Sequence, residues 1–152
     1  MAEIGTSRAT PDTTTKGEPM AATIEGRSRE LLEGKNFCLV TTLRKDGTPF
    51  DVITWVDVQD SRVLLNTAEG RSWPQNLRND PRVWLVVPNM ENPYEYVRLA
   101  GRVAEDTHEG ADEHIDKLAK KYLGEDKYPF RQEGEVRVKI AIEPEQVQHV
   151  GQ

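Results

Sequence analysis

The 152-residue chain lacks several features that define large classes of protein. It has one cysteine, Cys38, so an internal disulfide is excluded, and because this thiol lies in an apolar segment we expect it to be buried and unreactive. No segment approaches the roughly 18 apolar residues of a membrane span, and the N-terminus lacks the apolar core of a signal peptide. These absences predict a cytoplasmic protein that does not bind a membrane.

Basic patches and familiar catalytic motifs are also missing. The 26 acidic residues outnumber the 20 basic ones, which gives a net charge of −6 and argues against nucleic-acid binding. The three histidines, His108, His114 and His149, have no cysteine or histidine at ligand spacing, so we expect no metal site, and we place His108 and His114 on or beside a charged helix. The nucleophile elbow, the P-loop and the glycine-rich dinucleotide motif are absent.

The remaining pattern is that of one small, strand-rich domain. Residues 1–26 contain too little apolar surface to offset the cost of ordering and are predicted to be a flexible tail, which leaves 27–152 as the folded domain. Several strands have apolar residues on both faces, which favours a closed or split β-barrel over a sandwich. We expect strands at 37–43, 50–58, 63–66, 83–87, 94–105 and 135–143, and helices at 28–34, from 72, and from 107 to Gly124.

Two strands carry more detailed predictions. Gly101 lies inside the strand 94–105 and indicates a bend or a bulge. The last strand alternates, so that Val136, Val138, Ile140 and Ile142 should face the core while Arg137 and Lys139 face water.

The most informative stretch is 66–82, where a strand gives way to a polar turn and a short helix. Ser72 is a suitable N-cap, Gln75 completes a capping-box spacing, and Pro74 fits the first turn. A helix N-terminus offers unpaired N–H groups to an anion, and Arg71, Arg78 and Arg82 add positive charge nearby. A phosphate-bearing cofactor suits this place. The alternative is an ordinary strand, turn and helix with solvated arginines.

The same stretch resembles a known family. Residues 66–71 and 76–83 are similar to the phosphate-binding segment of the coenzyme F420 (deazaflavin)-dependent oxidoreductases, within the pyridoxamine 5′-phosphate oxidase-like, FMN-binding split β-barrel superfamily. Segments 37–49, 92–103 and 114–124 resemble the family in the same order, so the likeness covers roughly 28–150. It implies a mainly β split barrel of six to seven antiparallel strands with peripheral helices, assembled as a homodimer.

The resemblance also implies the site. The phosphate of the cofactor would contact Asn66, Thr67, Arg71, Ser72 and Asn76, with Arg78 as a weaker candidate, and the ring would lie along Val52, Ile53, Thr54 and Trp55. For Ser72 and Asn76 the alternative to contact with the cofactor is helix capping. For Trp55 the alternative is a position in the hydrophobic core. The family usually has lysine where this chain has Trp73, which would pack over the cofactor or against the partner subunit.

The implied activity is hydride transfer from reduced coenzyme F420 to a small conjugated or quinone-like acceptor. No side chain is an obvious proton donor, and Tyr94 is the candidate from a pocket-forming region. Two alternatives stay open: an FMN-dependent oxidoreductase of the same fold, and a non-catalytic carrier of a cofactor, haem or lipid-like ligand. A basic rim that includes Arg78 or Arg82 would favour the deazaflavin, because its polyglutamate tail is anionic.

Overall fold

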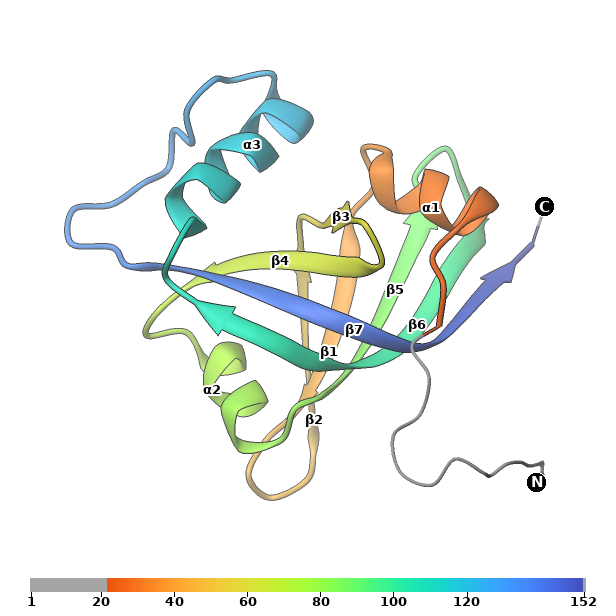
Figure 1. The fold of residues 1–152 in the computed structure, drawn as a ribbon, viewed down its shortest axis with the longest axis horizontal. Coiled ribbons are helices and arrows are strands. Elements are labelled where there is room, and N and C mark those ends of the chain that lie inside the picture. The colour runs from red at the N-terminus through yellow and green to blue at the C-terminus, as the bar shows by residue number, and fades with distance from the viewer. Residues whose placement is uncertain (1–21, 152) are drawn as a thin grey trace.

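The computed structural model describes residues 22–151 and shows a strongly curved, seven-stranded antiparallel sheet with three helices around it (Figure 1). Hydrogen-bonded neighbours follow the order β2-β1-β5-β6-β7-β4-β3. The predicted mainly β fold is therefore confirmed. In chain order the elements are α1 (Gly26–Glu33), β1 (Cys38–Leu43), β2 (Pro49–Thr54), β3 (Asp57–Gln59), β4 (Arg62–Ala68), α2 (Ser72–Asn79), β5 (Arg82–Asn89), β6 (Asn92–Thr107), α3 (Ala111–Leu123) and β7 (Arg137–Val150).

The two edge strands of the sheet follow one another in the chain. Only Trp55 and Val56 separate the end of β2 from the start of β3, so the sheet has to curl until its edges approach, although it does not close. The prediction of one strand over 50–58 was therefore wrong. At the break Val56 is fully buried, and its N–H donates to the Tyr122 hydroxyl (3.1 Å) instead of to a neighbouring strand. We call this break the seam.

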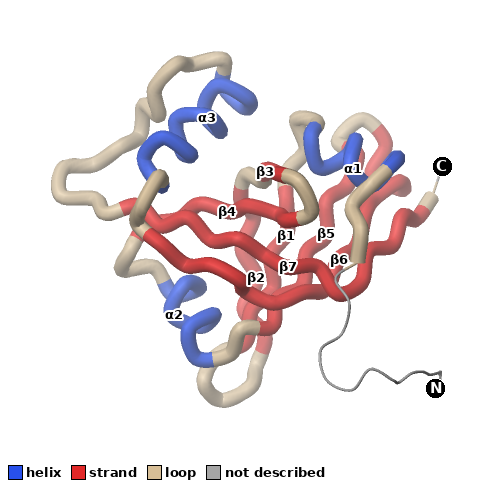
Figure 2. The backbone as a smooth tube through the Cα atoms, in the orientation of Figure 1, coloured by secondary structure: helices blue, strands red, loops and turns tan. Residues whose placement is uncertain are grey.

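The concave side of the sheet encloses the main hydrophobic core. Every strand of the sheet contributes apolar side chains to it. Helices α1 and α2 lie on different sides of the sheet (Figure 2) and add Leu31, Leu32, Trp73 and Leu77 to this core. Burial of this apolar surface is the main source of stability. Cys38 belongs to this core, as predicted, and burial raises the pKa of its thiol.

Helix α3 packs outside the main core and forms a second, smaller one. Its Ile115, Leu118 and Tyr122 contact Trp55 at the seam and Tyr128 in the long connection to β7. The helix ends at Gly124, whose φ of +76° suits glycine, as predicted. Its predicted start at Thr107 was wrong. Strand β6 runs to Thr107, whose hydroxyl accepts the Glu109 N–H (3.0 Å) in a turn before the helix.

Strand β7 differs from the predicted alternation at its first residues. Val136 lies outside the strand and is exposed, whereas Arg137 is 4% exposed. Val138, Ile140 and Ile142 face the main core as expected. The reason for the difference is that α3 packs on β7, so the face of the strand that alternation assigned to water is covered.

The N-terminal boundary also differs from the prediction. Residues 1–21 of the predicted flexible tail lie outside the described part of the chain, but residues 22–26 lie within it. There the Ala22 N–H donates to the Pro144 carbonyl (2.9 Å), Ile24 joins the main core, and α1 already begins at Gly26. The packed domain therefore includes residues 22–26.

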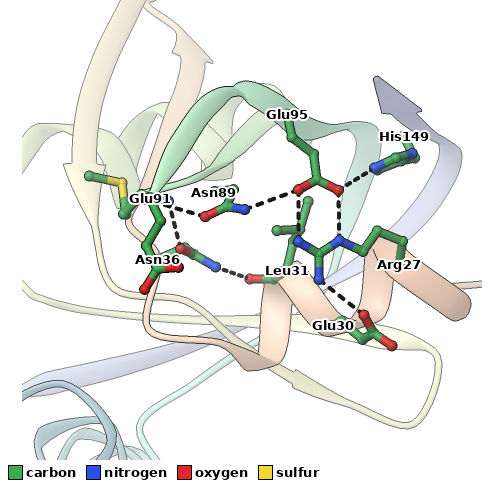
Figure 3. Close-up of polar contacts among 9 residues, drawn as sticks. Arg27, Glu30, Leu31, Asn36, Asn89, Glu91, Glu95 and His149 are labelled. Atoms are coloured by element: carbon green, nitrogen blue, oxygen red, sulfur yellow. Dashed lines mark hydrogen bonds and ion pairs between the residues drawn. The ribbon is translucent and has the colours of Figure 1, made fainter. Parts of the chain in front are cut away.

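A buried carboxylate on β6 binds α1 to the sheet through hydrogen bonds (Figure 3). Glu95 of β6 is 2% exposed and accepts hydrogen bonds from Arg27 of α1 at 2.6 and 2.7 Å. Asn89 donates to it at 3.0 Å, and His149 Nε2 lies 2.8 Å from it. The Arg27 hydrogen bond is the largest of the effects that hold the pKa of Glu95 well below its usual range. This network joins α1, β5, β6 and β7.

No helix within residues 22–151 is long and apolar enough to cross a membrane.

Candidate functional site

A pocket of about 260 Å³ opens at the seam, where the barrel meets α3. It is built from segments that are distant in the sequence: the residue before β1, the end of β2, β4 and the turn after it, α3, the connection from α3 to β7, and the first residue of β7. Five residues predicted to hold a cofactor line it. The full lining is Phe37, Ile53, Thr54, Trp55, Asn66, Arg71, Ile115, Leu118, Tyr128, Phe130 and Arg137.

One wall of the pocket is aromatic and rigid. The Tyr122 ring stacks on Trp55 with centroids 5.1 Å apart and ring planes 5° from parallel, and Phe37 stacks on Tyr122 at 5.7 Å. The Tyr122 hydroxyl is fixed by donation to the Asn36 carbonyl (2.5 Å). Tyr128 meets the edge of Trp55 at 6.0 Å. Trp55 therefore combines both roles considered for it, because it packs in the small core and also lines the pocket.

The polar part of the pocket lining centres on Arg137. Its Nε donates to Asn66 Oδ1 (3.0 Å), its Nη1 donates to Glu135 Oε2 (3.0 Å), and its guanidinium lies 5.1 Å from the centroid of the Tyr128 ring. Sequence reasoning missed Arg137, because alternation placed it in water. Ala141 was a usable signal that this face of the strand is covered. It lies on the same face as Arg137 and is apolar, so the face is not consistently polar.

Asn66 is linked further to His114 and Asp57 by a series of buried polar contacts. His114 lies on the charged helix α3, as predicted, but on its buried face, where it is 6% exposed. Its Nδ1 lies 3.1 Å from Asn66 Nδ2, and its Nε2 lies 3.2 Å from Asp57 Oδ2. Burial alone would raise the pKa of Asp57, but the His114 hydrogen bond and the Lys117 charge outweigh burial and lower this pKa to about 2. Asp57 is therefore a carboxylate at neutral pH.

Arg71 is the exposed cation of the pocket. Within residues 22–151 its guanidinium makes no hydrogen bond or ion pair, and it lies between the pocket and an adjoining groove of about 450 Å³. That groove carries the carboxylates of Glu69, Glu133 and Glu135. Arg71 can therefore bind an anion at the mouth of the pocket, whereas Glu69 and Glu135 of the groove are already paired with Arg78 and Arg137.

Helix α2 does not bring its predicted ligands to the pocket. Ser72 is the first residue of the helix rather than its cap, and no side chain caps this N-terminus, so the predicted capping box is wrong. Asn76 is buried and donates to Thr42 Oγ1 (3.1 Å), which ties α2 to β1. Trp73 is 3% exposed in the main core and does not replace the missing lysine at a phosphate.

Two more predicted cofactor contacts lie inside the barrel. Val52 packs against the main core, and Thr67 is fully buried with a hydroxyl that has no hydrogen-bond partner among the described residues. Neither side chain lines the pocket. The reason is alternation: their strand neighbours Ile53 and Asn66 take the positions that face the pocket.

The expected basic rim is neutralised by ion pairs. Arg78 contacts Glu69 at 2.9 Å and Asp106 at 2.8 Å, and Arg82 contacts Asp80 at 2.8 Å. The suggested proton donor, Tyr94, is 87% exposed at the start of β6 and is not part of the pocket lining. Within the described part of the chain no group of three or more potential ligand side chains is placed to hold a metal ion.

Known structures share this fold. An F420 reductase is 23% identical, with a TM-score of 0.72 over 82% of this chain and 98% of that one. General Stress Protein 26 from Bacillus anthracis is 16% identical, with a TM-score of 0.58 over 80% and 88% of the two chains. HupZ from Group A Streptococcus is 18% identical, with a TM-score of 0.60 over 80% and 89%. At these identities the likeness shows the fold alone.

Sequence comparison identifies the family. No curated protein matches the chain significantly. Residues 24–151, nearly all of the described chain, match the family model described as pyridoxamine 5′-phosphate oxidase. This match agrees with the split barrel that the resemblance predicted, and the chain belongs to the pyridoxamine 5′-phosphate oxidase family.

Proposed function

We propose that the chain is a coenzyme F420-dependent oxidoreductase that transfers hydride from the reduced cofactor to a small conjugated or quinone-like acceptor. The family and the F420 reductase among its structural neighbours support flavin- or deazaflavin-binding oxidoreductase-like function. The observation that carries the proposal is the pocket at the seam, whose lining combines the rings of Trp55 and Tyr128 with the guanidinium groups of two arginines.

The residues of the pocket fit a planar ring with a phosphate-bearing side chain. Ile53, Thr54 and Trp55 offer apolar contact and the backbone of an edge strand, which suits the faces and the polar rim of such a ring. Arg71 is placed at the mouth to bind the phosphate, since guanidinium can engage it through two parallel hydrogen bonds. The bound cofactor would supply the hydride. The protein would orient it and keep water from it.

A specific observation supports FMN as the second candidate. The anionic tail of the deazaflavin needs cations beyond the phosphate, but Arg78 and Arg82 are already paired with carboxylates. Glu69, the partner of Arg78, also lines the groove beside Arg71, where Glu133 and Glu135 add two more carboxylates. FMN has no such tail and would need Arg71 alone, so the pairing of Arg78 and Arg82 is the observation on which this second candidate rests.

A second copy of the chain would complete the pocket. The pocket volume of about 260 Å³ lies near the lower limit of ligand sites, roughly 300 Å³. Ile53 lines the pocket and is 65% exposed on the outer face of the sheet, where it lies opposite Leu39, which in turn lies opposite Val86. Trp84 adds to this apolar face. We propose that two copies pack through this face as a homodimer.

Fluorescence titration of the purified protein with coenzyme F420 and, separately, with FMN tests the proposed function. We expect micromolar binding of the deazaflavin with weaker binding of FMN. Arg71→Gln should weaken binding by about tenfold or more, because a charge-assisted contact contributes about 1.5–3 kcal/mol. Arg82→Gln, which removes a paired surface arginine, is the control and should bind as the wild type does.

Each other outcome has a definite meaning. Preferential binding of FMN would overturn the deazaflavin assignment and establish the second candidate. Binding of neither cofactor would overturn both enzyme proposals and favour the carrier.

A further inference from the structure

Arg137 is a buried cation whose hydrogen bonds are incomplete. Its Nε and Nη1 donate to Asn66 and Glu135, but within residues 22–151 its Nη2 has no acceptor. Guanidinium carries five N–H donors, and Nη2 is not among the fully buried side-chain atoms that lack a partner, so its free N–H groups are open to the pocket. The side chain is only 2% exposed, yet it lines the pocket. The only direction in which a ligand can complete these bonds is from the pocket.

The charge around the pocket points to an anion. The chain has a net charge of −6, but the pocket lining contains two arginines and no aspartate or glutamate. Arg137 is paired with Glu135 through one hydrogen bond, but the guanidinium lines the pocket and the Glu135 carboxylate does not. Arg71 has no carboxylate partner in the described chain. An acceptor group with negative charge therefore meets a positive local field on entering the pocket.

The orientation of Arg137 is fixed by a chain of buried hydrogen bonds. Arginine only donates, so the Asn66 oxygen has to face Arg137, and the Asn66 nitrogen then donates to the Ala111 carbonyl (2.9 Å) and to His114 Nδ1. His114 Nδ1 is thus an acceptor, and its proton lies on Nε2, which donates to Asp57. Each polar atom in this series of hydrogen bonds is therefore assigned either as donor or as acceptor, and the series ends at the ionised carboxylate of Asp57.

From this geometry we infer that Arg137 makes the pocket selective for a planar ligand that carries a carboxylate or phosphate group. Asn66, His114 and Asp57 act as positioning residues that aim the guanidinium, and the aromatic wall of Trp55 and Tyr128 receives the ring of the ligand. The inference rests on the proposed function in one respect, because both place the ligand in the same pocket. It deepens that function by stating that the cofactor or the acceptor bound there is anionic next to its ring.

A pair of matched probes tests this selectivity without any cofactor. The full chain is titrated with 2-naphthoate and with the neutral 2-naphthamide, and quenching of tryptophan fluorescence reports binding beside Trp55. We expect naphthoate to bind at least tenfold more tightly than the amide. In Arg137→Gln this ratio should fall to near one, and in Arg102→Gln, which removes a surface arginine paired with Glu145, it should stay as in the wild type.

A second variant keeps the test valid if Arg137→Gln does not fold, as judged by circular dichroism. Asn66→Asp preserves side-chain size and places a carboxylate against Arg137, so it should also reduce the preference for naphthoate. The inference is overturned if the wild type shows no preference for naphthoate, or if the preference survives in the folded Arg137 variant, or in Asn66→Asp where only that variant folds.

Competition then distinguishes the source of the anion. If FMN or coenzyme F420 displaces naphthoate, Arg137 binds the cofactor; if naphthoate binds to the cofactor-loaded protein, Arg137 binds a carboxylate of the acceptor. Either result supports the inference. Because the probe titrations need no cofactor, failure of cofactor binding would overturn the proposed function and leave this inference standing, and loss of the naphthoate preference would do the reverse.

Discussion

At the scale of single residues, the polar side chains buried in this domain fall into two kinds. Asn66, Asn76 and Glu95 use their polar atoms in hydrogen bonds that join elements distant in the sequence. The Thr67 hydroxyl is fully buried and has no partner among residues 22–151. The first kind stabilises the fold, whereas the second costs stability because the hydroxyl loses its hydration without compensation.

Two fully buried threonines allow this difference to be measured. Thr67→Val replaces an unpartnered hydroxyl with a methyl group of similar shape, so we expect the free energy of unfolding to stay unchanged or rise by up to about 1 kcal/mol. Thr42→Val is the matched control, since Thr42 accepts a hydrogen bond from Asn76; it should destabilise by about 1–3 kcal/mol. Urea unfolding of both variants gives the comparison. Clear destabilisation by Thr67→Val would show that its hydroxyl has a partner.

At the scale of elements, the long strand β6 has to bend in order to pair with both β5 and β7. Its register with β7 shifts between Ala100 and Gly101 and again between Val103 and Glu105. The bend or bulge predicted at Gly101 is therefore confirmed. At this point the backbone of β7 approaches so closely that a Cβ at position 101 would overlap the Glu143 carbonyl oxygen. The glycine is needed for space.

Gly101→Ala should consequently destabilise the domain. The added methyl group has to displace backbone rather than a flexible side chain, and overpacking of this kind costs about 1–3 kcal/mol. Gly34→Ala is a control with a smaller expected effect, because the nearest atoms to its new methyl, in the Asn36 side chain and the Glu30 carbonyl, are 3.1 and 3.2 Å away, whereas a methyl at position 101 would overlap the Glu143 carbonyl oxygen. Thermal and urea unfolding measure both. Equal stability of the Gly101 variant and the wild type would contradict the close approach.

At the scale of the whole molecule, the curled sheet leaves an apolar outer face next to the pocket. Ile53, Leu39 and Val86 lie side by side across β2, β1 and β5, and Ile53 also lines the pocket. A partner on this face would therefore shield apolar surface and narrow the mouth of the pocket with the same contact.

Replacing Ile53 tests this assembly. We expect the wild type to be a dimer by light scattering, and Ile53→Asp to shift it toward monomer because a carboxylate would be buried against apolar surface. Leu123→Asp introduces the same charge at an exposed apolar residue of α3 rather than of the sheet, and should remain dimeric. A monomeric wild type, or an Ile53 variant that stays dimeric, would contradict the proposed interface.

Much of the architecture was predictable because its signals are local. Strand alternation, the glycine that ends α3 and the glycine inside β6 depend on backbone geometry within a few residues. The resemblance over 28–150 supplied the barrel, and the position of Ile53, Thr54 and Trp55 beside Asn66 and Arg71 agrees with it. Predictions failed at element ends, where Ser72, Thr107 and Val136 look suitable by type but the surrounding contacts decide otherwise.

The sequence by itself determined which segments become strands and helices, since hydrophobic periodicity and turn residues act over one element at a time. Tertiary structure alone decided which faces are covered. Packing of α3 on β7 buries Arg137 and His114, and the curling of the sheet brings the seam beside them. Those contacts join residues far apart in the chain, so the charge and shape of the pocket depend on how the whole sheet folds and cannot be read from any single segment.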